Sequence, residues 1–186
     1  MTAPQELRTA RLLLRSLETE DIPSLVQLAG AREIASRTAN IPHPYLEEDA
    51  QTFLAKASED FRSGDSATFA ISVPPARELW GAIGLTIQPA HKRAELGYWI
   101  GVPYWNQGYA TEAASAVVAF GFGALGLHRI YAFVHAGNSA SARVLEKIGM
   151  RHEGRSREHV RKWGEFVDLE NYAMLAGDLS PRRLKT

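Results

Sequence analysis

Residues 102–120 read VPYWNQGYATEAASAVVAF and join an uncharged turn to a regular helix. A helix start leaves several backbone N–H groups without intrahelical partners, and the aligned peptide dipoles add partial positive charge there. Gly108 lets the backbone approach a ligand, Ala110 keeps the first helical turn thin, and Thr111 adds a hydroxyl donor. This pattern predicts an anion site made of main chain, whose fixed concavity suits a diphosphate. The same residues would also serve an ordinary capped helix start.

Two further side chains are candidates for handling a proton. Glu95 lies on a predicted strand over residues 94–100, where alternation places it with Gly97 and Trp99 on one face. His135 ends a predicted strand over residues 129–135. Each has a structural alternative, since Glu95 can form an ion pair on the sheet and a lone histidine can simply fill space.

The elements that must position these residues follow from periodicity. Strands are predicted at 11–17, 68–73, 79–87, 94–100, 129–135, 152–161 and 166–175, and helices at 19–29, 50–64, 110–125 and 139–148. The helix between the fourth and fifth strands implies a right-handed parallel crossover. We therefore predict one α/β domain over residues 8–176 with a mixed sheet, order β-α-α-β-β-β-α-β-α-β-β, and tails at 1–7 and 177–186.

Composition excludes several function classes. The 21 basic and 21 acidic residues balance, so neither nucleic acid nor an anionic membrane is expected as a direct partner. The absence of cysteine excludes disulfides, cysteine-ligated metals and an acyl-cysteine intermediate, and no metal site is predicted. No run of eighteen apolar residues occurs, and we expect a cytoplasmic protein. Gly121, Gly123 and Gly126 form a G-x-G-x-x-G pattern, but they follow a predicted helix, so we interpret them as fraying and capping.

Three separated stretches together resemble the GNAT superfamily of N-acetyltransferases, and specifically its RimJ/RimL-type branch. They are ARLLLRSLETEDI at 10–22, ELGYWIGVPYWNQGYATEA at 95–113 and NSASARVLEKIGM at 138–150, and the resemblance covers about residues 8–175. The superfamily pattern Q/R-x-x-G-x-G/A falls on Trp105, Asn106, Gln107, Gly108, Tyr109 and Ala110. Trp105 departs from the usual Gln or Arg, and an aromatic residue there is similar to the RimJ/RimL branch.

The resemblance implies the fold, the cosubstrate and several roles. The fourth and fifth strands would splay apart, and the turn would bind the pyrophosphate of acetyl-CoA through backbone amides. Asn138 would bond the pantetheine arm or cap its helix, and Ser141 would stabilise the departing thiolate. Many relatives use a tyrosine acid where this chain has Leu145. The backbone amides of Trp99, Ile100 and Gly101 would polarise the acetyl carbonyl.

The acceptor would be a primary amine that enters from the other side of the splayed strands. A protein α-amine has a reference pKa of roughly 7.7 to 8.0, against roughly 10.4 for lysine, so Glu95 or water suffices as its base. The resemblance places His43, Tyr45 and Trp163 along this cleft, although Tyr45 and Trp163 would also serve as loop anchors. Alternation puts Arg155, Arg157, His159 and Arg161 on one strand face, which would attract an acidic acceptor or the CoA 3′-phosphate, or simply face solvent.

The sequence therefore favours an acetyl-CoA-dependent N-acetyltransferase in which the amine attacks directly in a ternary complex. A ribosomal or other protein N-terminus is the expected acceptor. The alternatives are a small amine, such as a polyamine, an amino acid or an aminoglycoside, and a catalytically silent acyl-CoA-binding module. A homodimer is compatible with these features.

Overall fold

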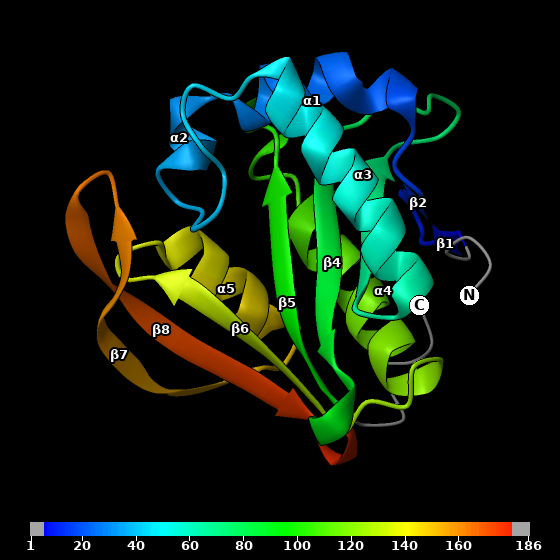
Figure 1. The fold of residues 1–186 in the computed structure, drawn as a ribbon. Coiled ribbons are helices and arrows are strands. Elements are labelled where there is room, and N and C mark those ends of the chain that lie inside the picture. The colour runs from blue at the N-terminus through cyan, green and yellow to red at the C-terminus, as the bar shows by residue number, and fades with distance from the viewer. Residues whose placement is uncertain (1–5, 180–186) are drawn as a thin grey trace.

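The computed structural model describes residues 6–179, whose strands form one mixed sheet in the order β1-β2-β3-β4-β5-β6-β8-β7 (Figure 1). The strands are β1 (Leu7–Arg8), β2 (Leu13–Arg15), β3 (Ser66–Ser72), β4 (Gly81–Gln88), β5 (Arg93–Ile100), β6 (Arg129–His135), β7 (Arg151–Lys162) and β8 (Glu165–Leu175). The helices are α1 (Ile22–Ala29), α2 (Arg32–Ala35), α3 (Glu47–Ser63), α4 (Tyr109–Gly123) and α5 (Ser139–Lys147). The predicted mixed α/β fold is confirmed.

The predicted order of long elements is found, with three local differences. The first long strand is shorter than expected, since β2 covers only Leu13–Arg15, and β1 and α2 were not predicted. The sheet begins at Leu7, and the Asp178 carboxylate accepts a 3.0 Å hydrogen bond from Arg151. Residues 1–5 and 180–186 of the two predicted tails lie outside the described residues.

Two apolar cores lie on the two faces of the sheet. Helix α4 packs on β4 and β5, and α1 and α3 pack on β4 and β3. Alternate residues of β5 contact different cores, since Leu96 is buried in the larger one and Trp99 packs against the smaller one. Gly121 corrects the interpretation of the glycine pattern: a Cβ there would lie 2.8 Å from Ile130 Cδ1, so this glycine allows α4 to approach the sheet closely rather than marking a frayed end.

The strands β5 and β6 form the gap that the predicted site needs. Their parallel pairing joins Arg93 to Arg129 and Glu95 to Tyr131, and it ends there. Beyond this point the two strands diverge (Figure 1). By contrast, β4 pairs with β5 along its whole length, from Gly81↔Ile100 to Gln88↔Arg93. The second half of β5 therefore keeps one free edge inside the fold.

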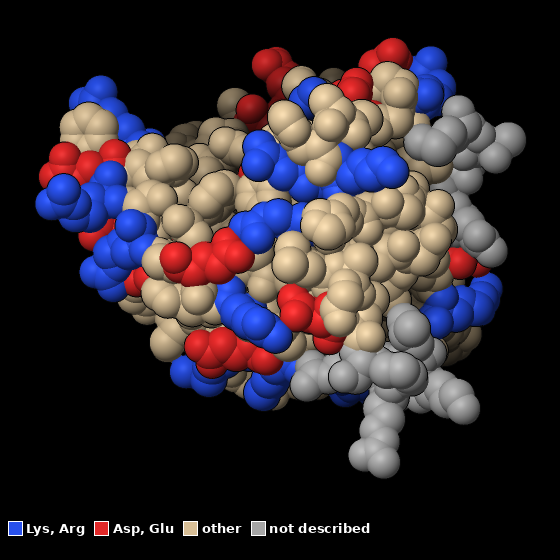
Figure 2. All heavy atoms as spheres, turned by 90° about the horizontal axis from the view of Figure 1, so that it is seen from below, with Lys and Arg blue, Asp and Glu red and all other residues tan. Residues whose placement is uncertain are grey.

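Surface charge is mixed on the face seen in Figure 2, where cationic and anionic groups lie interspersed. This agrees with the balance of 21 basic and 21 acidic residues. Within residues 6–179, no helix has the length and apolarity that crossing a bilayer requires.

Candidate active site

The turn before α4 has a defined backbone shape. The indole N–H of Trp105 donates to the carbonyl oxygen of Ile100 at 2.6 Å, which ties the turn to the end of β5. Asn106 and Gly108 have φ values of 60° and 82°, and α4 begins at Tyr109. The left-handed conformation of Gly108 therefore favours glycine, and the close approach of a ligand at this position stays a prediction.

The backbone N–H groups of residues 106–111 have no acceptor among the described residues. The next donor, Glu112 N–H, begins the helical ladder by bonding Gly108 oxygen at 3.0 Å. The Gln107, Gly108 and Asn106 side of the turn is exposed, so these donors are accessible. Free amides at the positive end of a helix suit a diphosphate, so binding of the CoA diphosphate here stays a prediction.

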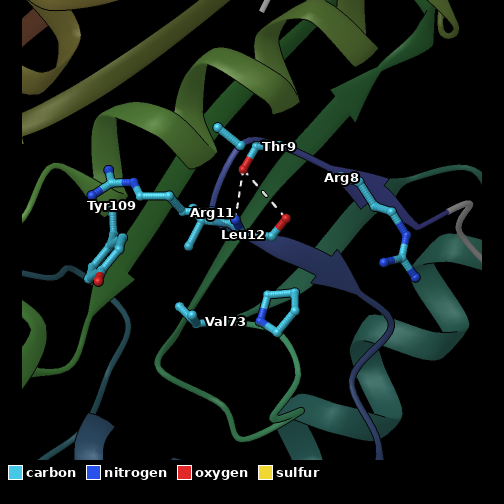
Figure 3. Close-up of a pocket in the computed structure, with 8 residues that line it drawn as sticks. Arg8, Thr9, Arg11, Leu12, Val73 and Tyr109 are labelled. Carbon is cyan, nitrogen blue, oxygen red and sulfur yellow. Dashed lines mark hydrogen bonds between the residues drawn. The ribbon is translucent and has the colours of Figure 1, made fainter.

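Arg11 contacts this turn and stabilises its shape. Its guanidinium donates to Gln107 oxygen at 3.0 Å, pairs with Glu112 at 2.7 Å and lies 4.7 Å from the centre of the Tyr109 ring. A cavity of about 330 Å³ lies beside it, lined by Arg8, Thr9, Ala10, Arg11, Leu12, Val73, Pro74 and Tyr109 (Figure 3). Since Arg11 is already paired with Glu112, its charge holds the turn in place, and sequence reasoning missed this role.

The gap between β5 and β6 corrects the predicted set of carbonyl-polarising amides. Gly101 N–H bonds Trp80 oxygen at 2.8 Å, so it points toward β4. In an antiparallel pair the direction of the N–H groups alternates, so Trp99 N–H also points to β4, and Ile100 N–H faces the gap. Tyr98 N–H faces the gap as well, and it was not predicted. Trp99 and Gly101 cannot serve as donors there.

The first turn of α5 lies across this gap from β5. Asn138 is its N-cap, with Oδ1 accepting from Ser141 N–H at 3.3 Å, which confirms the capping alternative. Ser141 Oγ lies 2.8 Å from the Tyr98 hydroxyl, which also donates to Ser141 oxygen at 3.2 Å. Burial raises the pKa of Tyr98 to about 12. Leu145 is fully buried in the core.

A second cavity of about 420 Å³ lies on the β8 side of α5. Its lining residues are Val134, His135, Gly137, Asn138, Ser139, Ala142, Glu146, His152, Glu170 and Tyr172. His152 Nε2 lies 2.7 Å from Glu170, so these two groups already pair. Across residues 6–179, no three His, Asp or Glu side chains are close enough to share a metal ion.

Glu95 stands where β5 and β6 part, opposite Tyr131 on the neighbouring strand. Burial raises the pKa of Glu95, and the charge of His159 partly offsets this. The ring of His159 stacks on Phe133 at 5.5 Å between centroids. A half-buried carboxylate beside a histidine can accept a proton from an amine.

The loop before α3 and the β7–β8 hairpin meet at one end of the gap. The rings of His43 and Trp163 are 6.0 Å apart, and Lys162 Nζ donates to Ile41 oxygen at 2.7 Å. The guanidinium of Arg32 lies 5.3 Å from the Trp163 ring centre. His43 and Trp163 are therefore brought together, as the prediction required, although their contact with an acceptor stays a prediction.

His135 also lies at this end of the gap. Burial lowers the pKa of His135 and the charge of Lys162 lowers it further, whereas a hydrogen bond with the Ser36 backbone partly offsets this. Its Nε2 is buried and has no hydrogen-bond partner among the described residues. A largely neutral imidazole in this position is chemically able to accept a proton, and its catalytic role also stays a prediction.

Tyr45 is not in the cleft wall. It is 9% exposed and packs with Leu25, Ala29, Ala50, Ala70 and Leu79 in the smaller core. Burial and the charge of Asp49 raise its pKa to about 12. Its position favours the loop-anchor interpretation over contact with an acceptor, because its side chain is taken up by the core.

The predicted basic face of the sixth long strand is wrong. Strand β7 has a register shift between Ser156 and Val160, and Glu158 has φ 49°. Arg155 bonds Glu170, the partner of Val134, whereas His159 stacks on Phe133, the partner of Asn171. Adjacent residues of β6 point to opposite faces, so Arg155 and His159 do not share one. The bulge breaks the alternation on which the prediction rested.

Comparison with known proteins decides the family. Residues 11–151 match the acetyltransferase (GNAT) domain family. The chain belongs to the GNAT family. It is an acyltransferase, with an N-acetyltransferase activity that uses acetyl-CoA and an amine acceptor.

Individual relatives agree with this family. The chain is 32% identical to the uncharacterised N-acetyltransferase YoaA of Bacillus subtilis over 91% of this chain and 96% of YoaA. It is 29% identical to spermidine N(1)-acetyltransferase of Escherichia coli K12, covering 76% of this chain and 73% of that protein.

Solved structures support the same conclusion. A GNAT-family acetyltransferase from Bacillus anthracis has a TM-score of 0.82 at 29% identity, covering 93% of this GNAT chain and 99% of that one. RimJ of Mycobacterium smegmatis, solved with CoA-disulfide, has a TM-score of 0.84 at 22% identity, with 97% and 91% covered. The latter likeness shows the fold alone.

Proposed function

We propose that this GNAT enzyme acetylates the N-terminal α-amine of a protein or peptide. The observation that carries the proposal is the charge of the acceptor wall. Arg32 and Lys162 lie against the ring of Trp163 at the end of the gap where His43 also lies, and neither forms an ion pair with a described carboxylate. Such a wall accepts a neutral or acidic chain and repels a polycation.

Residues on both sides of the gap would hold the cosubstrate. The free N–H groups of residues 106–111 bind the diphosphate, and Arg11 keeps their turn in shape. The Asn138 amide group faces the pantetheine arm while Oδ1 caps α5. Acetyl-CoA supplies the acetyl group as an activated thioester. The N–H groups of Tyr98 and Ile100 donate toward the carbonyl oxygen, where negative charge develops.

Glu95 would take the proton of the attacking amine. Burial raises the pKa of Glu95, which makes it a better base than an exposed carboxylate. An α-amine with a reference pKa of roughly 7.7 to 8.0 is already partly neutral there. A lysine or polyamine nitrogen would need a stronger base, which also favours the N-terminal acceptor. Ser141 would face the leaving sulfur.

A small amine is the second candidate, because the spermidine acetyltransferase of Escherichia coli is 29% identical. Spermidine is a polycation, and its recognition calls for carboxylates along the cleft. Here the acceptor wall instead presents Arg32 and Lys162. A silent acyl-CoA-binding module is the third candidate. Cytoplasmic location and a homodimer stay predictions.

The test follows release of CoA from acetyl-CoA with a thiol reagent. Peptides beginning with Ser, Ala, Thr or Met are compared in pairs that carry Asp and Glu, or Lys, at the next positions; spermidine, amino acids and an aminoglycoside form the other arms. The chain has no cysteine, so its own background is absent. We expect turnover with peptides, highest for the acidic members. Turnover with spermidine alone would overturn the proposal, and CoA binding without turnover on any acceptor would assign a silent module.

A further inference from the structure

The hydroxyl of Tyr98 reaches Ser141 from the far side of the gap. Its oxygen lies 2.8 Å from Ser141 Oγ and donates to Ser141 oxygen at 3.2 Å. Tyr98 lies on β5 beyond the last residue that pairs with β6, and Ser141 lies in the first turn of α5. The pair therefore bridges the two elements that the gap separates.

Ser141 is fixed from a second direction as well. Its N–H donates to Asn138 Oδ1 at 3.3 Å, which holds the start of α5. Leu145, one turn further along, is fully buried and has no proton to give. The phenol beside Ser141 is therefore that of Tyr98 on β5, and α5 supplies none at Leu145.

We propose that Tyr98 is a positioning residue that turns the Ser141 hydroxyl hydrogen toward the leaving sulfur, which departs as a thiolate without receiving a proton from either group. Either hydroxyl can donate across the 2.8 Å contact; in the proposed arrangement the single Tyr98 hydrogen points to Ser141 Oγ rather than to the Ser141 carbonyl oxygen, so the serine hydrogen remains available for the sulfur. This inference rests on the proposed acetyl transfer at the same site. Ser141 donates while the C–S bond breaks and its electron pair stays on sulfur. The new C–N bond forms to the amine, whose proton leaves to Glu95 or water.

Acidities oppose a full proton transfer. Burial raises the pKa of Tyr98 to about 12, despite the opposing Ser141 hydrogen bond. A thiol has a reference pKa of roughly 8.5, so moving the phenol proton to a thiolate would be uphill by about 3.5 pH units. A serine hydroxyl is a still weaker acid. Ser141 therefore stabilises the anion by hydrogen bonding while Tyr98 holds the Ser141 hydroxyl in place, and both groups stay protonated.

Few other charges act on this pair. On α4, Glu112 is already bonded to Arg11 and Thr9. On α5, Arg143, Glu146 and Lys147 are exposed to solvent. On β4, the residue opposite Tyr98 is the apolar Ile83. The proposed base Glu95 also acts on the thioester, but it is unchanged in every variant compared, so differences in the thiol pKa between variants should report mainly on Tyr98 and Ser141.

The experiment measures the thiol pKa of bound CoA from the ultraviolet absorbance of its thiolate. The protein has no cysteine, so this signal comes from the ligand alone. We expect a pKa below the free value of roughly 8.5 in the wild-type complex. Ser141→Ala and Tyr98→Phe should each raise it by about one pH unit, the size of a hydrogen bond to a charged group, and the double variant should add little.

Matched controls remove the same groups elsewhere. Tyr131→Phe deletes a phenol hydroxyl from β6 whose partner is Gln88, and Ser139→Ala deletes an exposed hydroxyl from the same turn of α5. Neither should move the thiol pKa. Circular dichroism checks that each variant folds. If Tyr98→Phe does not fold, Ser141→Ala still tests the inference.

Kinetics supply the second readout. Tyr98→Phe should lower kcat about tenfold and leave the KM for acetyl-CoA unchanged. An unchanged thiol pKa in both variants would overturn the inference, as would a kcat of Tyr98→Phe equal to that of the wild type. A lowered thiol pKa in a protein that acetylates no amine would overturn the proposed function and leave this inference standing.

Discussion

Replacing Gly108 with alanine tests whether the main-chain turn binds the diphosphate. Gly108 has φ 82°, and a Cβ there would meet only Arg11 Nη2, at 3.4 Å. That contact is ordinary and involves the end of a flexible side chain, so crowding costs little. The left-handed backbone is the main cost, about 1–2 kcal/mol for a residue with a Cβ.

This cost must appear in one of two measurements. If the turn keeps its shape, Gly108→Ala lowers the free energy of unfolding by about 1–2 kcal/mol and binding stays close to wild type. If the turn relaxes, stability recovers but the free N–H groups no longer converge. CoA binding then weakens by roughly five- to thirtyfold, because the same free energy must be spent on restoring the turn. We predict that the loss in unfolding free energy and the loss in CoA binding free energy add up to about 1–2 kcal/mol.

Urea unfolding of the free protein and calorimetric titration with CoA measure the two terms. Gly123→Ala is the matched control, because Gly123 ends the same helix and a Cβ there meets nothing within 4 Å. It should leave CoA affinity unchanged and stability unchanged or slightly higher. Gly108→Asn should recover part of the loss, since asparagine tolerates the left-handed region. Wild-type stability together with wild-type affinity in Gly108→Ala would refute the role given to this turn.

Three further predictions concern other parts of the molecule. Glu95→Gln should lower kcat and abolish the rise of activity with pH that follows ionisation of this carboxyl. Because burial raises the pKa of Glu95 in the folded protein, the wild type loses stability as this carboxyl ionises with rising pH. The variant should therefore have a higher melting temperature at pH 7. A wild-type pH profile in Glu95→Gln would exclude Glu95 as the base. Asp21→Ala leaves Arg15, which is 2% exposed, without its 2.7 Å partner, and urea unfolding should show a loss of about 3–5 kcal/mol. Lys56→Ala, which removes an exposed helical pair, should cost less than about 0.5 kcal/mol, and similar losses in the two variants would contradict this account. Arg32→Glu should reduce kcat/KM for acidic peptides by about three- to tenfold and improve it for basic ones, whereas Arg62→Glu on α3 should change neither; equal effects of both variants would show that only net charge matters.

The long elements could be predicted because each carries a complete periodic signal. Apolar residues on α4 recur through more than three helical turns, and the predicted range of 110–125 differs from Tyr109–Gly123 by two residues at most. Alternation along residues 94–100 correctly separated Leu96 from Trp99, which contact different cores. The uncharged turn could be located because a helix start leaves free donors whatever its side chains are.

Short and irregular elements could not be predicted in this way. Strand β1 has two residues and α2 has four, so neither completes a detectable period. The bulge in β7 contains Glu158, which has a positive φ. Glutamate rarely adopts this conformation, so its residue type does not predict the bulge. Arg32 and Lys162, which pair with no carboxylate among residues 6–179, come together only where α2 meets the hairpin.

The contact between Tyr98 and Ser141 could not be predicted from local sequence patterns, because it depends on how the strands pair. The two residues are 43 positions apart, and their meeting depends on the angle at which β6 leaves β5. Pairing with β4 fixes the directions of both the side chain and the N–H group of Tyr98. Along a strand the side chains alternate between the two faces of the sheet, and the N–H groups alternate between the two edges of the strand. Tyr98 therefore sends its phenol to α5 and its N–H into the gap. A one-residue slip of β5 against β4 would exchange Tyr98 for Trp99 or Gly97 and remove both donors together, so this register constrains the chemistry as strongly as any side chain in the site.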